Sequence, residues 1–500
     1  MKLAHAALAL LLASGTAHAA GTLRFGLEFD PDVLDPARET SYTNRIVFNA
    51  MCDSLLNIGP DLSFVPELAT AWEWSEDKLS LTVHLRENVQ FQDGEPFTAE
   101  AMRLNMERYR TAPESQRKTE MSAITGEDVV DAHTLRIRLK TPYAPLLSLL
   151  ASRPGTPMSP RVLAKGSDEI AAHPVCAGPF AFKERVAQDH ILLERFPGYW
   201  NAGAVKLDRI LFRTVPDSTV RRVNLQAGAL DVVDKLAPSD IQQVQKDPKL
   251  RVVTRPSIGF QPVALNVGNG PGADTPFGRD SRVREAFEKS IDREAINQVV
   301  FDGKFVPSNQ TEAPGSRYWD PARAVPPRDL EGAKRLLKEA GQTRVAIDFL
   351  TNSDPVNVQI GEMIQAMAAE AGFDVKVVSL DSAGGVDMTK RGAYQASMLI
   401  WSGRPDPDGN VSTWVGCKGS TNWTGYCNPA AEALLIKGAQ TLEPEQRAPV
   451  YRELTETWMK DRPYLVLFHF TWIWGTSAKV EGFAPRPDGI ARPIGVSLRE

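Results

Sequence analysis

The chain has 500 residues, with 57 Lys and Arg against 62 Asp and Glu and a formal net charge of −5 at pH 7. This mildly acidic balance argues against a protein that binds nucleic acid and against one held at an anionic membrane surface. The length exceeds what one hydrophobic core usually serves, so we expect two or three domains.

Residues 1–19 have the pattern of a cleavable export signal. Lys2 supplies the positive start, residues 6–13 form a short apolar core, and Ala17-His18-Ala19 gives a cleavage point before Ala20. The apolar run is too short to span a bilayer. No Cys follows the cleavage point, so a lipid anchor is not expected there. We predict an exported, soluble mature protein.

The first part of the mature chain mixes strand and helix patterns. A strand is predicted over residues 22–28 and a helix from about 43 to 56. Apolar and polar residues then alternate strictly over 79–86, which is typical of a strand with one solvent-facing side. Thr98 is a good N-cap for a helix that continues to Arg108.

The second half of the chain predicts a parallel sheet. Strand patterns over 345–350, 375–380 and 396–401 alternate with helix patterns, the first of which begins at Asp354-Pro355. Such alternation places helices on the faces of a parallel sheet. A last strand pattern over 464–474 would carry the chain back toward its first part.

Charged residues directly follow the strand that is predicted to end at Trp401. Gly403 and two prolines stop this strand, and Arg404, Asp406 and Asp408 come just beyond its end. In open α/β sheets, ligands bind outside the carboxyl ends of the strands. The segment therefore predicts a ligand site, and an ordinary polar turn after a buried strand is the alternative.

Four cysteines in an exported chain favour disulfides. Cys417 and Cys427 close a small loop and are the expected first pair, which leaves Cys52 and Cys176 to pair over a long separation. A zinc site is the alternative. It would need closely spaced Cys or His ligands, and the sequence has no Cys-x-x-Cys and no His near Cys417 or Cys427.

Several long motifs carry a resemblance to a known family. They are Pro66-Glu-Leu-Ala-Thr-Ala-Trp-Glu-Trp74, then Leu85-Arg-Glu-Asn-Val-Gln-Phe-Gln-Asp-Gly-Glu-Pro-Phe-Thr-Ala-Glu100, and further segments at 174–182, 193–200 and 283–296. Together they resemble the family 5 extracellular solute-binding proteins, the dipeptide and oligopeptide receptors of ATP-binding-cassette (ABC) importers. The resemblance covers essentially the whole mature chain.

The resemblance implies an α/β fold, namely a two-lobed periplasmic binding protein of type II, from the large cluster with an extra inserted subdomain. Lobe I would comprise residues 20–52, 176–264 and 476–500, the inserted subdomain residues 53–175, and lobe II residues 265–475. A ligand would lie in the cleft between the lobes, which close around it by a hinge motion.

The resemblance also implies a function without catalysis. A periplasmic monomer with no cofactor, no metal and no nucleic acid would deliver its ligand to ABC permease subunits in the inner membrane, which work with cytoplasmic ATPases. The expected ligand is a small peptide or a related carboxylate-bearing solute, and a non-peptide organic solute or a metal chelate is the alternative. A remote alternative is an exported hydrolase. It depends on Ser75-x-x-Lys78, whose partner motifs Ser-Asp-Asn and Lys-Thr-Gly are absent.

The segments that reach the cleft in relatives supply the candidate ligand contacts. These are Glu39, Thr40, Ser41 and Tyr42 before the first long helix, Phe260 and Asn266 near the crossing between the lobes, Trp401, Ser402, Gly403, Arg404 and Asp406 after the central strand, and Trp423 and Tyr426 within or beside the disulfide loop.

One position departs from the pattern of the dipeptide receptors. In those proteins an Asp after Trp-x-Gly holds the α-amino group of the ligand, whereas Arg404 directly follows Trp401-Ser402-Gly403 here. A guanidinium group matches a carboxylate in two parallel hydrogen bonds and stays charged when desolvated. We therefore predict that Arg404 binds a ligand carboxylate, while Asp406 could still serve an amino group. The alternative is that Arg404 pairs internally with Asp406 or Asp408.

Overall fold

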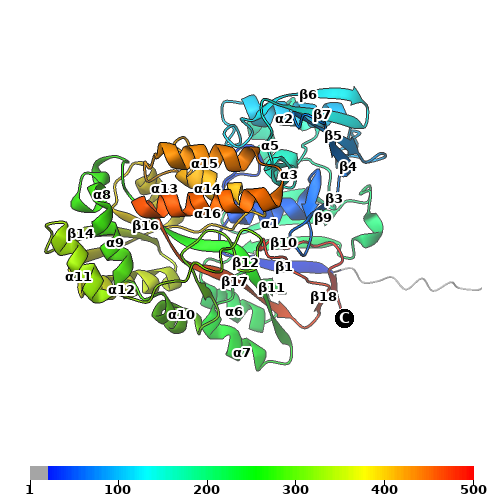
Figure 1. The fold of residues 1–500 in the computed structure, drawn as a ribbon. Helices are drawn as coiled ribbons and strands as arrows, with labels where there is room; N and C mark the ends of the chain where they lie inside the picture. Colours follow the sequence, from blue (N-terminus) through cyan, green and yellow to red (C-terminus); the bar gives the residue numbers. More distant parts are fainter. Residues whose placement is uncertain (1–20, 500) are drawn as a thin grey trace, which may run out of the picture.

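A long mixed sheet of 11 strands runs through the molecule (Figure 1). The computed structural model describes residues 21–499, and the predicted export signal, residues 1–19, lies outside them. In spatial order the strands are β15 (Phe373–Leu380), β14 (Val345–Asn352), β16 (Ala396–Met398), β12 (Leu250–Leu265), β17 (Tyr464–Ser477), β11 (Val232–Val233), β1 (Thr22–Leu27), β10 (Arg209–Thr214), β9 (His190–Arg195) and β8 (Phe180–Val186), with β13 (Val306–Pro307) paired to β17.

Strands β12 and β17 connect the two halves of this sheet. They pair antiparallel from Leu250 opposite Ser477 to Ala264 opposite Tyr464, and the register shifts on either side of Phe260. Such bulges bend a strand pair. One end of the pair packs into the hydrophobic core around β1 and β10, and the other end into the core around β14 and β15. We call these two parts lobe I and lobe II.

Lobe II contains the predicted parallel unit. Strand β14 pairs in parallel with β15 and with β16, and the helices α12 (Pro355–Ala369) and α13 (Ser382–Lys390) connect these strands. Asp354 caps α12 by accepting hydrogen bonds from the backbone N–H groups of Val356 and Asn357. The β-α-β-α-β prediction is therefore confirmed.

The prediction that this last strand continues to Trp401 is wrong. Strand β16 ends at Met398, opposite the part of β12 where the pairing of β12 with β17 becomes irregular around Phe260. A single isolated bridge then joins Phe260 to Trp401. The segment after β16 is thus fastened to the bend of β12.

A separate four-stranded sheet lies within the region predicted as an inserted subdomain, at the upper right of Figure 1. Its order is β4 (Ala69–Trp74), β5 (Ser80–Leu85), β7 (Thr134–Leu139) and β6 (Ile124–Asp131), and α2 (Ala99–Thr111) packs against β6 and β7. Thr98 caps α2 as predicted, by accepting a hydrogen bond from the N–H of Ala101. The exact borders of this subdomain stay a prediction, since Met158, Val162 and Ile170 pack into the core of lobe I.

Helix α1 (Tyr42–Met51) is shorter than predicted. The sequence pattern extended it to residue 56, but Cys52 already has an extended backbone. The chain then forms β2 (Leu56–Ile58), which pairs with β3 (Phe64–Pro66). The apolar residues after Met51 therefore belong to a strand.

The remaining helices cover the sheets. Near the inserted subdomain these are α3 (Leu146–Leu150), α4 (Pro160–Leu163) and α5 (Ser167–Ala172); beside β11 and β12, α6 (Ser218–Gln226) and α7 (Ile241–Gln245); on lobe II, α8 (Pro276–Arg279), α9 (Ser281–Ser290), α10 (Arg293–Phe301), α11 (Leu330–Glu339), α14 (Asp408–Val415), α15 (Pro429–Gln440) and α16 (Pro444–Asp461). Strands β18 (Val480–Glu481) and β19 (Ser497–Leu498) form a short ladder. Within residues 21–499, no helix combines the length and the apolar character needed to cross a membrane.

Both predicted disulfides are present. Cys52 and Cys176 are joined with a Cα–Cα distance of 5.4 Å, and Cys417 and Cys427 with one of 4.5 Å. The first bridge is buried in the core of lobe I, and the second closes the loop between α14 and α15. All four cysteines are thereby used, which removes the zinc alternative.

Removing the first bridge should destabilise the protein more than removing the second. The bridges span sequence separations of 124 and 10 residues. Loop-closure entropy then assigns them about 5 and about 3 kcal/mol. Urea denaturation of the Cys52→Ala/Cys176→Ala and Cys417→Ala/Cys427→Ala variants measures both losses. Equal losses, or a larger loss for the second pair, would contradict this expectation.

Candidate ligand-binding cavity

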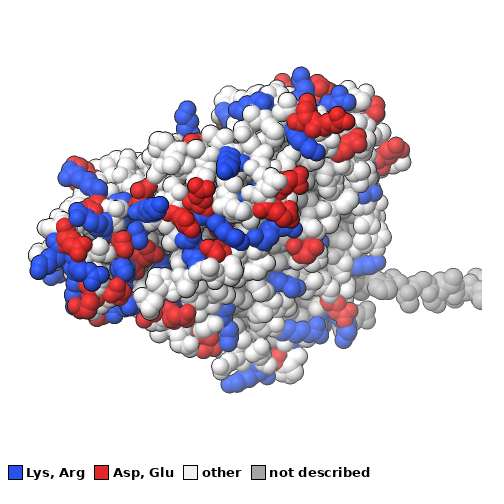
Figure 2. Space-filling model, viewed as in Figure 1, with Lys and Arg blue, Asp and Glu red and all other residues white. Residues whose placement is uncertain are grey.

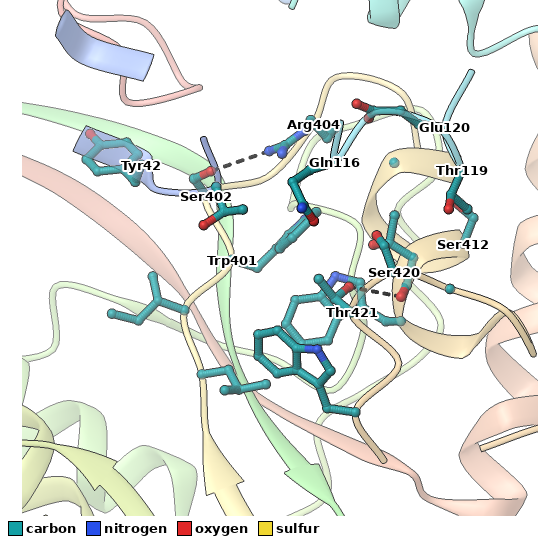
Figure 3. Close-up of a pocket in the computed structure, with 18 of the residues that line it drawn as sticks. Tyr42, Gln116, Thr119, Glu120, Trp401, Ser402, Arg404, Ser412, Ser420 and Thr421 are labelled. Atoms are coloured by element: carbon teal, nitrogen blue, oxygen red, sulfur yellow. Dashed lines mark hydrogen bonds between the residues drawn. The ribbon is translucent and has the colours of Figure 1, made fainter. Parts of the chain in front are cut away.

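A cavity of about 680 Å³ lies between lobe I, lobe II and the inserted subdomain. Its walls come from the segment that leads into α1, from residues 116–122 and 143–153 of the predicted subdomain, and from segments that follow β14, β15 and β16. Figure 3 shows Tyr42, Gln116 and Arg404, one from each part, around this space. The volume is within the range of pockets that enclose small molecules.

The start of α1 forms one wall. Ser41 is the N-cap, and its Oγ accepts a hydrogen bond of 3.2 Å from the N–H of Asn44. The ring of Tyr42 stacks on Trp472 of β17, with ring centroids 5.2 Å apart. The hydroxyl group of Tyr42 donates a hydrogen bond of 2.6 Å to the carbonyl oxygen of Gly489. These contacts fix the start of α1 against the strand that crosses between the lobes.

The loop from Trp401 to Asn410 forms the opposite wall. Trp401 exchanges two backbone hydrogen bonds, of 2.9 and 3.1 Å, with Phe260 of β12. The side-chain oxygen of Asn410 accepts from the N–H of Arg404 at 2.7 Å and from Nε1 of Trp401 at 3.0 Å. Gly403 has a φ of +79°, and a Cβ there would lie 2.4 Å from a backbone carbonyl oxygen of β12. Glycine is therefore required for this loop to lie against the strand.

Arg404 borders the cavity without a carboxylate partner. Its Nη1 donates to the carbonyl oxygen of Gly403 at 2.8 Å and to Oγ of Ser402 at 3.4 Å. The guanidinium group lies over the ring of Trp401, 4.7 Å from its centroid. No Asp or Glu oxygen of residues 21–499 lies within 4.0 Å of its nitrogens. The internal ion pair with Asp406 or Asp408 that the sequence left open is not formed.

Asp406 is instead neutralised by Arg447 of α16. Its two oxygens accept hydrogen bonds of 2.7 and 2.9 Å from Nη1 and Nη2 of Arg447, and both side chains are buried. Burial raises the pKa of the neighbouring Asp408 to about 6, with a further contribution from Asp406. The hydroxyl group of Tyr451 donates to Asp408 at 3.3 Å. Since its charge is already matched, Asp406 supports the wall and does not offer a free carboxylate for a ligand amino group.

Arg45 is a second guanidinium group at the same end of the cavity. It lies in the first turn of α1, and its Nη1 donates to Oγ of Ser402 at 2.9 Å. Burial lowers the pKa of Arg45 to about 10, with a contribution from the nearby cation of Arg153. Burial likewise lowers the pKa of Arg404 well below its usual value, and Arg45 contributes in the same direction. Guanidinium groups stay protonated in proteins, so both side chains carry a positive charge.

The structure brings most of the predicted contact residues to the cavity wall. Those that line it are Thr40, Ser41, Tyr42, Trp401, Ser402, Arg404, Asp406 and Trp423. The other five predicted residues, Glu39, Phe260, Asn266, Gly403 and Tyr426, lie outside this lining. Whether any of these residues touches a ligand stays a prediction.

The residues outside the lining hold the wall in place. Glu39 is fully buried and forms an ion pair with Arg153. Phe260 is buried against the ring of His469. The side-chain amide of Asn266 donates to backbone carbonyl oxygens in two neighbouring loops, and the hydroxyl group of Tyr426 donates to Asp461 at 2.8 Å.

The sequence did not indicate several lining residues. Arg45 lies within a helix pattern, where charged residues are most often solvent-exposed. Gln116, Thr119 and Glu120 come from turns after α2, and Figure 3 shows them opposite the lobe II wall. No periodicity marks such turns, so the contribution of the inserted subdomain was not predicted. Among the described residues, no group of three or more His, Cys, Asp or Glu side chains is placed to hold a metal ion.

A sequence model of the bacterial extracellular solute-binding proteins, family 5 (middle region), matches residues 63–422. The chain belongs to this family. The resemblance read from the motifs is therefore confirmed, and so is the two-lobed α/β fold that it implied.

Relatives and solved structures match this solute-binding protein over nearly its whole length. The glutathione-binding protein GsiB of Pectobacterium atrosepticum is 27% identical over 470 residues, which cover 91% of this chain and 90% of GsiB. The structure of AgaA from A. tumefaciens R10, in complex with agropinic acid, matches with a TM-score of 0.87 and 25% identity over 96% of this chain and 99% of AgaA. A dipeptide-binding protein of Pseudoalteromonas sp. SM9913, in complex with Met-Leu, shares the fold with a TM-score of 0.88 and 22% identity over 96% and 100% of the two chains.

Replacement of Asp406 by Asn should destabilise this solute-binding protein by about 3–5 kcal/mol, because it leaves the buried guanidinium group of Arg447 without its counter-charge. Asp168, which pairs with Arg38 at the surface and is fully exposed, provides the control. Asp168→Asn should change the free energy of unfolding by less than about 1 kcal/mol. Urea denaturation at neutral pH compares the two variants. Similar losses in the free energy of unfolding would show that the buried ion pair contributes no more to stability than the surface pair.

Proposed function

We propose that this protein captures a small peptide, or a related solute that carries a carboxylate, in the cavity between its lobes and delivers it to the permease of an ABC importer. The observation that supports this most directly is the position of Arg404. Its guanidinium group borders the cavity and lacks an acidic partner in the described part of the chain. A ligand carboxylate would supply the missing counter-charge in two parallel hydrogen bonds.

The relatives support the same ligand class. One is named for glutathione, a peptide, and two solved structures hold agropinic acid and the dipeptide Met-Leu. The agropinic acid complex favours a second candidate, a non-peptide organic acid. A third candidate, a metal chelate, is supported by likeness of fold alone, for example to a Staphylococcus aureus protein solved with Ni(L-His)2, at 21% identity.

The proposed mechanism is binding and lobe closure in the periplasm, without catalysis. The lining residues come from both lobes, so a ligand in the cavity would contact both and favour the closed form. The family consists of solute-binding proteins. A receptor of this kind needs a permease with ATPase subunits as its partner, and it requires no covalent step of its own.

A thermal-shift screen tests the receptor function. The library contains di- and tripeptides, glutathione, organic acids and nickel–histidine chelates. A true ligand should raise the melting temperature progressively with its concentration, as mass action requires. Turnover of a library peptide or ester that disappears in a cavity variant would overturn the proposal, and so would a library without any stabilising compound.

Calorimetry with the ligand found in that screen tests the role of Arg404. Loss of a desolvated, hydrogen-bonded charge partner typically costs about 2–5 kcal/mol of binding free energy. We expect Arg404→Ala to weaken binding by that amount, and Arg404→Lys to weaken it less because the charge remains. If both variants bind within a factor of about three of the parent, Arg404 does not hold the ligand.

A further inference from the structure

Two cations from opposite lobes meet at one hydroxyl group. Arg45 belongs to α1 in lobe I, and Arg404 to the loop after β16 in lobe II. The Nη1 atoms of both donate to Oγ of Ser402, at 2.9 and 3.4 Å. Because one oxygen lies within reach of both, a single small anion can contact both guanidinium groups at once.

The surrounding charges do not neutralise these two cations. Two more guanidinium groups nearby are each matched by a carboxylate, in the pairs Arg153–Glu39 and Arg117–Glu120. Within residues 21–499, Arg45 and Arg404 form no ion pair with any carboxylate. This end of the cavity therefore has an excess of two positive charges.

More distant side chains of the lining add further positive charge. Lys390 and Lys418 both line the cavity with exposed side chains, and neither forms an ion pair in the described part of the chain. Of the acidic side chains of the lining, Asp406 is matched by Arg447, whereas Asp381, Asp408 and Glu432 form no ion pair in the described part of the chain. Four cations of the lining, Arg45, Arg404, Lys390 and Lys418, thus lack an ion-pair partner within residues 21–499, against three carboxylates.

We infer that the solute is acidic, with two carboxylate groups and a net negative charge, and that Arg45 and Arg404 hold these groups from opposite lobes. The inference rests on the proposed receptor function and narrows its ligand class. The single carboxylate of a zwitterion could contact both guanidinium groups but would neutralise only one of the two positive charges, and its ammonium group would bring a further cation into the cavity. Two partly desolvated like charges without counter-ions are unfavourable, and a second carboxylate removes this cost.

Matched acid and amide ligands test the charge requirement. The probes are Ala-Glu against Ala-Gln and succinate against succinamate, which differ by one carboxylate at nearly equal size. Each dicarboxylate found in the thermal-shift library is also compared with its own monoamide. Calorimetry should give at least about 30-fold weaker binding for every amide, the loss expected when a buried charged partner becomes neutral. Equal binding of acid and amide overturns the inference.

Variants of Arg45 test whether the two guanidinium groups hold the ligand from opposite lobes. Arg45→Met should weaken the dicarboxylate at least about 30-fold and reduce its advantage over the monoamide, while Arg45→Lys should restore part of the binding. Arg335→Met is the matched control, because Arg335 is an exposed arginine of α11 outside the cavity lining. It should bind as the parent does. Circular dichroism and the melting temperature without ligand show whether each variant is folded.

The outcomes separate this inference from the proposed function. Stabilisation by neutral peptides only, with no response to acidic probes, would leave the receptor function standing and overturn the acidic ligand. Tight binding of an acid that is unchanged in Arg45→Met would show that Arg45 does not hold a carboxylate of the ligand. Absence of binding by every library compound would count against both.

Discussion

The antiparallel pair of β12 and β17 holds two walls of the cavity, the start of α1 and the loop that contains Arg404. Tyr42 at the start of α1 stacks on Trp472 of β17, and the loop that contains Arg404 is tied to Phe260 of β12 through Trp401. Both strands belong to both hydrophobic cores. Because the register of the pair shifts at Phe260, the loop is attached where the connection between the lobes bends. A change in the angle between the lobes therefore acts directly on the distance between α1 and this loop.

The two positive charges that face each other across the cavity make the free energy of the protein depend on the angle between the lobes. The Nη1 atoms of Arg45 and Arg404 each lie within 3.4 Å of the same oxygen, so they are at most about 6 Å apart. At an effective dielectric constant of 20, two unit charges at that distance repel by about 3 kcal/mol. Conformational equilibria of binding proteins are governed by differences of a few kcal/mol. The repulsion thus favours separated lobes in the empty protein. An anion that contacts both groups reverses the sign of this contribution.

The surface contrasts with the cavity. Figure 2 shows positive and negative side chains interspersed over the visible face of the molecule. Exposed charges of mixed sign are well solvated and interact weakly. Water screens the buried groups around the cavity less effectively, so their electrostatic interactions are stronger than those of the exposed surface charges.

Much of the fold could be predicted from the sequence, because its signals are local. The caps at Thr98 and Asp354, the alternation before residue 86 and the β-α-β-α-β order all depend on near neighbours in the chain. The cavity depends on distant contacts and was predicted only in part. Arg404 could be identified from its place after a buried strand. Arg45 and the turns around Glu120 carry no local signal, since their role arises only when three separate regions come together.

The composition of the lobe I core has a consequence for the order in which the chain can fold. This core combines Leu23 and Phe25 near the start of the described chain with Trp474, Ile490 and Val496 near its end. Strand β1 has β11 and β10 as neighbours, and β11 in turn pairs with β17. Lobe I therefore cannot be completed while the last segment of the chain is still being synthesised. Such long-range contacts slow folding, because the entropy of closing the long loop is lost before the contacts are gained.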